Sequence, residues 1–163
     1  MIVARFVVRS LQEPDPRSLG YLRDAHALGF STLQRVDCRD LYFIAGDLRP
    51  EDLDELAARL LADPVTQAAS WELYPAAGEE EPLSMDAHII EVALRPGVTD
   101  PAAEEIVRAA RELGIPGVAR AATGLRFLVR GAGMQPSDLE LLIRRLLANP
   151  VIQRAAIGRI EPS

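Results

Sequence analysis

The chain has 163 residues, of which 48% are hydrophobic, and a formal net charge of −6 at pH 7. This length and composition allow a buried core and correspond to one ordinary domain or two small ones. The acidic balance excludes the broad basic surface that binds nucleic acid. The apolar runs are too short to cross a bilayer and the single cysteine can form no internal disulfide, so we expect a cytoplasmic protein with neither a nucleic-acid nor a membrane partner.

The chain begins with a predicted strand followed by a predicted helix. Along residues 2–9, the apolar residues Ile2, Ala4, Phe6 and Val8 alternate with a second set, Val3, Arg5, Val7 and Arg9, and this period of two is that of a strand. Asp15 followed by Pro16 is typical of a helix start, because an aspartate caps free N–H groups and proline lacks the N–H that would remain unpaired. Gly29 is typical of the left-handed residue that ends a helix.

The next segments predict further strands and a second helix. Residues 33–45 read as either a pair of strands or one long bent strand. Residues 50–61 carry leucines at helical spacing, and Pro64 prevents the helix from continuing. Residues 71–74 read as a closing strand, and residues 76–86, with three consecutive glutamates, read as an acidic linker.

After the linker the same pattern returns at an offset of 85 residues. Asp15-Pro16 aligns with Asp100-Pro101, Arg35 aligns with Arg120, and the closing strand of the second copy is expected at residues 157–160. A period this long exceeds that of a solenoid unit, so we predict two copies of a small domain. Their predicted limits are residues 1–75 and 87–163, with the linker between them.

The element order predicts an α+β fold built from two ferredoxin-like β-α-β-β-α-β repeats. Each repeat would place two helices on one face of a four-stranded antiparallel sheet and leave the other face bare. Because an exposed apolar sheet face forgoes burial, we expect the two antiparallel sheets to cover each other as a pseudo-dimer.

The sequence indicates no active site. His26 and His88 have no ligand partners at metal-binding spacing, and neither is repeated in the other copy. Cys38 has no nearby histidine in sequence, and the glycines form no phosphate-binding loop. We therefore expect no catalytic residue, no cofactor and no metal.

The second copy has a distinctive strand, turn and helix pattern in Arg95, Pro96, Gly97, Asp100 and Gly124, together with "LLANPVIQ" at residues 146–153. Through these residues it resembles the PurS-type small subunit of phosphoribosylformylglycinamidine (FGAM) synthase. The resemblance implies two PurS-like repeats forming a noncatalytic adaptor in purine biosynthesis, either free-standing or at the front of a longer chain. It would bridge a PurL-type synthetase and a PurQ-type glutaminase, with possible self-association, and the five residues named above are its candidate partner interface.

Two other hypotheses remain open at this point. ACT-like regulatory modules share the β-α-β-β-α-β order and bind small molecules between paired copies, which would favour the turn at residues 95–100 as a ligand site. A small αβ-barrel enzyme would need a cluster of ionisable groups in a cleft, and the sequence shows no such cluster.

Overall fold

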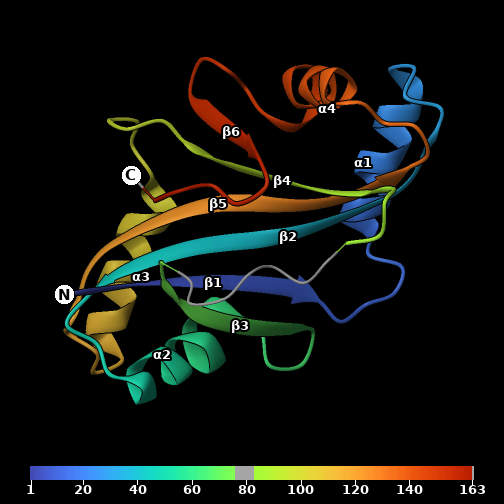
Figure 1. The fold of residues 1–163 in the computed structure, drawn as a ribbon. Helices are drawn as coiled ribbons and strands as arrows, with labels where there is room; N and C mark the ends of the chain where they lie inside the picture. Colours follow the sequence, from blue (N-terminus) through green and yellow to red (C-terminus); the bar gives the residue numbers. More distant parts are fainter. Residues whose placement is uncertain (76–82, 163) are drawn as a thin grey trace.

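The structure is a computed structural model that describes residues 1–75 and 83–162 (Figure 1). The first half contains β1 (Ile2–Ser10), α1 (Pro16–Ala27), β2 (Leu33–Gly46), α2 (Pro50–Leu56), the π-helical turn η1 (Ala57–Leu61) and β3 (Gln67–Tyr74). The second half contains β4 (Ala87–Leu94), α3 (Pro101–Glu112), β5 (Val118–Gly131), α4 (Pro136–Leu142), η2 (Ile143–Leu147) and β6 (Gln153–Ile157). Both halves therefore have the same element order. Most of the predicted acidic linker, residues 76–82, lies outside the described residues.

The predicted helix ends are found in both halves. Asp15 caps α1 by accepting from the backbone N–H of Arg17, and Asp100 caps α3 by accepting from that of Ala103, each with proline at the first helical position. Gly29 and Gly114 follow these helices with positive φ angles of 99° and 85°. Local sequence is therefore sufficient to place both helices.

All six strands form one antiparallel sheet in the order β3-β1-β2-β5-β4-β6, which confirms the α+β class. The ambiguous middle segment of each half is one strand of 14 residues, so each half contributes three strands instead of four. The two long strands pair with each other from end to end, with Leu33 opposite Gly131 and Gly46 opposite Val118. The halves thus meet edge to edge, and the expectation that their sheets cover each other face to face is wrong.

Each long strand extends beyond its partner strand in the same half. β1 pairs with β2 only over residues 40–46, and β4 pairs with β5 only over residues 124–130. β5 pairs with the opposite edge of β2 along its whole length. The part of β2 that β1 leaves uncovered receives side chains of α1 instead, since Cys38 N–H donates to the Ser18 hydroxyl at 2.9 Å and His26 contacts the Leu33 carbonyl at 2.6 Å. The closing strand of the second half was also misplaced by sequence, because β6 ends at Ile157.

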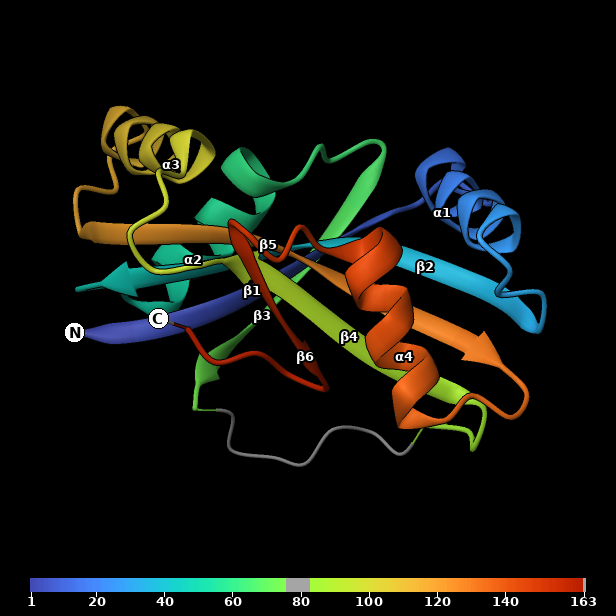
Figure 2. The same ribbon diagram turned by 90° about the horizontal axis from the view of Figure 1, so that it is seen from above.

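The long strands carry the first helix of each half into the other half's core. Because β1 stops at Ser10, α1 lies beyond the part of β2 that β1 covers, and Tyr21 of α1 meets Phe127 of β5 edge-to-face with ring centroids 5.0 Å apart. In the same way Ile106 of α3 packs in one core cluster with Leu53 and Leu56 of α2. Figures 1 and 2 show the resulting pairs, α1 beside α4 and α3 beside α2. Each core is therefore built from both halves.

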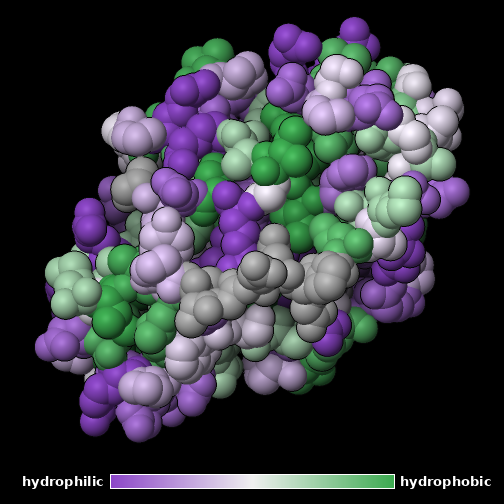
Figure 3. Space-filling view, in the orientation of Figure 1, coloured by the Kyte–Doolittle hydropathy of each residue, from purple (hydrophilic) through white to green (hydrophobic). Residues whose placement is uncertain are grey.

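The sheet face opposite the helices holds a smaller apolar cluster. Leu41, Phe43 and Ala93 lie in it with Ile160, which comes from the C-terminal segment after β6. Figure 3 shows this side of the molecule, with hydrophobic side chains gathered over the middle of β4 and β5 and hydrophilic ones beside them. The C-terminal segment thus covers part of the face that the sequence leaves bare.

Candidate functional site

The turn between β4 and α3 borders a cavity of about 210 Å³. Four of the five predicted interface residues, Arg95, Pro96, Gly97 and Asp100, line it. The rest of the lining comes from both halves, because it includes the starts of β1 and β5, the ends of β2 and β4, and the C-terminal segment. The cavity therefore lies at the turn that the ligand-binding hypothesis named, and the edge-to-edge junction of the halves creates it.

The turn is fixed by its own backbone and by a side-chain cap. Val98 N–H donates to the carbonyl of Arg95 at 3.1 Å, and Gly97 has a φ of 86°, a conformation that side chains other than glycine's rarely adopt. The carboxylate of Asp100 accepts from Ala103 N–H at 3.1 Å, from Thr123 N–H at 2.9 Å and from the Thr123 hydroxyl. Asp100 therefore caps α3 and ties it to β5.

Arg95 joins this turn to the loop at residues 149–153. Its N–H donates to the carbonyl of Ile152 at 2.8 Å, and its Nε donates to the carbonyl of Pro150 at 2.9 Å. The loop is stiffened in turn by Asn149, whose side-chain oxygen accepts from Val151 N–H at 3.1 Å. Turn and loop therefore form one continuous surface.

The fifth predicted residue, Gly124, lies on β5 outside the cavity. A Cβ atom at this position would come within 2.4 Å of the Val92 carbonyl oxygen, closer than any side chain allows. Close strand packing is thus enough to require a glycine here, and a partner contact through Gly124 stays a prediction.

Two arginines that sequence reasoning left out also line the cavity. Arg120 lies at the start of β5, and Arg154 lies on β6, where its Nη2 donates to the carbonyl of Glu161 at 2.7 Å. The alignment of Arg120 with Arg35 in the repeat could have pointed to Arg120 as a candidate site residue. No sequence pattern pointed to Arg154, because its place at the cavity depends on how β6 pairs with β4.

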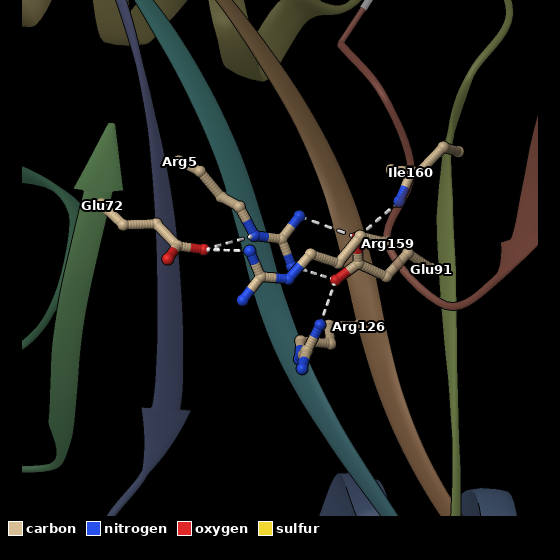
Figure 4. Close-up of polar contacts among 6 residues, drawn as sticks. All are labelled: Arg5, Glu72, Glu91, Arg126, Arg159 and Ile160. Atoms are coloured by element: carbon tan, nitrogen blue, oxygen red, sulfur yellow. Dashed lines mark hydrogen bonds and ion pairs between the residues drawn. The ribbon is translucent and has the colours of Figure 1, made fainter. Parts of the chain in front are cut away.

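A buried ion cluster links the two halves on the same sheet face. Glu91 of β4 is fully buried and accepts from Arg5 of β1, with 2.7 Å to Nη1, from Arg126 of β5 at 2.5 Å and from Ile160 N–H at 2.8 Å. Figure 4 shows the two guanidinium groups converging on this carboxylate, with Glu72 on the far side of Arg5. Arg5 reaches across β2 and β5 to do so, so the sheet is folded strongly enough to bring β1 and β4 together.

This ion cluster stabilises the fold. Both carboxylate oxygens of Glu91 accept hydrogen bonds, Oε1 from Arg5 and Ile160 and Oε2 from Arg5 and Arg126, and Arg5 is only 3% exposed. A buried charge that loses its partner is strongly unfavourable, so the cluster holds β1, β4, β5 and the C-terminal segment in register.

The Cys38 thiol and the His26 imidazole, which are groups of the kind used in catalysis, both pack within the fold. Burial raises the pKa of the Cys38 thiol to about 12, which suppresses the nucleophilic thiolate. His26 contacts the carbonyl of Leu33 at 2.6 Å. Within residues 1–75 and 83–162, no group of His, Cys, Asp or Glu side chains could hold a metal ion, and none of the helices described there is long and apolar enough to span a membrane.

Comparison with known proteins identifies a family for the second half. Residues 87–161 match the PurS family, described as phosphoribosylformylglycinamidine (FGAM) synthase. A comparison with curated proteins finds no match. The family match confirms the resemblance found in the sequence, and it supports a role in FGAM synthase, in purine biosynthesis, together with association with other subunits of that enzyme.

Proposed function

Because residues 87–161 form a PurS-type unit, we propose that this chain is a noncatalytic structural subunit or domain of FGAM synthase that bridges its synthetase and glutaminase components. The family match is the observation that carries the proposal. The repeated element order supports a tandem arrangement, in which residues 1–75 act as a second unit of the same kind. One chain would then supply what two copies of a small subunit supply.

The buried charges agree with a structural role. Glu91 is held by Arg5 and Arg126, and the Cys38 thiol is kept protonated by burial. Groups engaged in this way stabilise a fold and offer little acid–base or nucleophilic chemistry. Turnover would therefore come from the larger partner subunits.

Two matching loops offer apolar contact points for those partners. Val65 and Val151 occupy equivalent places after Pro64 and Pro150, and their side chains are 82% and 79% exposed. Both loops are rigid, because the Asp63 carboxylate accepts from Val65 N–H at 2.8 Å and the Asn149 side chain does the same for Val151. A rigid apolar tip loses little entropy on binding, so each loop suits a protein interface.

The predicted interface turn belongs to the same surface in the second half. Arg95 connects the turn at residues 95–100 to the loop that carries Val151. We propose that this combined surface contacts one large subunit and that the loop around Val65 contacts the other. Two similar but unequal surfaces on one rigid body would give a bridge between two different proteins.

Reconstitution of the enzyme tests the proposal. The chain is mixed with a PurL-type synthetase and a PurQ-type glutaminase, and the complex is followed by size-exclusion chromatography together with glutamine-dependent FGAM formation. We expect a ternary complex whose turnover depends on the chain. Turnover that is unchanged when the chain is omitted, with no co-elution, would reject the adaptor role.

Single substitutions locate the contacts. Val65→Asp and Val151→Asp should each weaken the complex, because a charge at the centre of an apolar contact loses its hydration. Leu19→Asp on α1 is the matched control, since Leu19 is also a large apolar side chain, is 49% exposed and belongs to neither loop. An equal effect of all three variants would argue against loop-specific contacts.

A further inference from the structure

The cavity beside the turn at residues 95–100 carries an excess of positive charge. Arg95 from the turn, Arg120 from β5 and Arg154 from β6 line it, and Asp100 is the one acidic residue among its described lining residues. The oxygens of Asp100 are already engaged by Ala103 and Thr123. The described lining therefore holds three arginines and one carboxylate whose oxygens are already engaged.

The equivalent arginine in the first half is neutralised within the chain. Arg35 corresponds to Arg120, and its Nε lies 2.9 Å from the Asp37 carboxylate, with Glu13 3.6 Å away. At the offset of 85, the second half has Ala122 in place of Asp37 and Val98 in place of Glu13. Two carboxylates that balance the first arginine are thus missing around the second.

The other two arginines are also specific to the second half. Arg95 corresponds to Ser10, and Arg154 corresponds to Ala68 after the one-residue slip in the alignment. The Nε of Arg154 is buried and has no hydrogen-bond partner within residues 1–75 and 83–162. A buried donor without an acceptor is costly unless a further group satisfies it, so this atom points independently to an acceptor beyond the described residues, such as a bound anion.

The remaining walls of the cavity are apolar and come from the sheet face opposite the helices. Val3, Phe43, Ala93 and Ala122 line the cavity beside the arginines. A volume of about 210 Å³ suits a small molecule more than a folded partner or an extended peptide. Apolar walls also strengthen charge pairing, because they lower the local dielectric.

We propose that this cavity binds a small organic anion, with its carboxylate or phosphate group among Arg95, Arg120 and Arg154 and its uncharged part against Phe43. Arginine suits this role because its planar guanidinium forms paired hydrogen bonds with both kinds of anion. The site needs only this chain, and it shares Arg95 with the surface proposed above to contact a large subunit. It gives an FGAM synthase component the means to sense an anionic metabolite.

Titration of the isolated chain tests the site. AMP and benzoate serve as phosphate and carboxylate probes with a planar apolar part, adenosine and benzamide as their uncharged counterparts, and inorganic phosphate as an anion without that part. Isothermal titration calorimetry should show saturable binding of AMP or benzoate, at least about tenfold tighter than that of adenosine, benzamide or inorganic phosphate. Which of the two anions binds identifies the headgroup.

Variants assign the binding to the cavity. Arg120→Gln should weaken binding at least about tenfold, because it removes an exposed cation that has no structural partner among the described residues. Arg130→Gln is the matched control, since Arg130 is also exposed and lies on the same strand ten residues away. Circular dichroism verifies that both variants are folded.

Several outcomes would overturn the proposal. They are the absence of saturable binding by every anion, equal binding of the uncharged counterparts, an equal loss in Arg130→Gln, or occupation of the arginines only by an acidic segment of a partner subunit. Failure here leaves the adaptor proposal standing, because complex formation and turnover are measured separately and Arg120→Gln should retain both.

Discussion

Replacing Glu91 by glutamine tests the buried ion cluster directly. The substitution keeps the shape of the side chain and an acceptor for Ile160 N–H, but removes the charge that Arg5 and Arg126 share. Arg5 is only 3% exposed, so its guanidinium would be a buried cation whose remaining counterion among the described residues is the partly exposed Glu72 carboxylate, 3.6 Å away. Breaking a buried pair in this way costs about 3–5 kcal/mol.

That cost corresponds to a large shift in thermal stability. For a chain of this size each kcal/mol lowers the Tm by about 2–4 °C, so Glu91→Gln should lower it by about 6–20 °C. The measurement is thermal and urea unfolding followed by circular dichroism. Glu140→Gln, an exposed change on α4, should stay within about 0.5 kcal/mol of the parent.

A second substitution gives the result that would refute the reasoning. Arg5→Met together with Glu91→Gln removes the buried cation that has lost its main partner and replaces it with an apolar side chain of similar length. If the penalty comes from that cation, the double variant should be more stable than Glu91→Gln alone, by about 1 kcal/mol or more. A double variant less stable than the single one would show that the charge of Arg5 is not the source.

Further predictions concern Gly124, Cys38 and Asp100. Gly124→Ala should destabilise the protein by about 1–3 kcal/mol in urea unfolding, because its Cβ would meet the Val92 carbonyl oxygen at 2.4 Å. Gly20→Ala is the control, because Gly20 lies in an open position of α1, where alanine should stabilise the protein by up to about 1 kcal/mol. Burial raises the pKa of Cys38 to about 12, so its alkylation by iodoacetamide at pH 8 should be at least about a hundredfold slower in the native than in the unfolded chain. The raised pKa also means that stability falls as the pH rises through the interval from about 9 to about 12. Asp100→Ala should cost about 1–2 kcal/mol, measured by the same unfolding, through loss of the α3 cap and of the contact with β5.

Part of the candidate site could be predicted from local pattern. The turn at residues 95–100 was found because a strand end, a glycine turn and an Asp-Pro helix start follow one another in the sequence. Arg154 and Phe43 could not be found in this way, because they reach the cavity from strands that are distant in sequence. The pair Arg5 and Glu91 was equally hidden, since an arginine and a glutamate in alternating strands read as ordinary solvent-facing residues.

The sequence by itself determined the period of 85 residues, the α+β class, the starts and ends of α1 and α3, and the resemblance of the second half to PurS. These features depend on capping, turn chemistry and hydrophobic period, which act over a few residues and are written in them. Only the tertiary structure decided that residues 33–46 and 118–131 are single strands that pair with each other. It also decided that α1 and α3 each pack in the core of the other half, and that Arg5 contacts Glu91. An alternating strand has the same pattern whether its neighbour lies beside it or over its face, so the choice between edge pairing and face packing depends on backbone hydrogen bonds between segments that are distant in the chain.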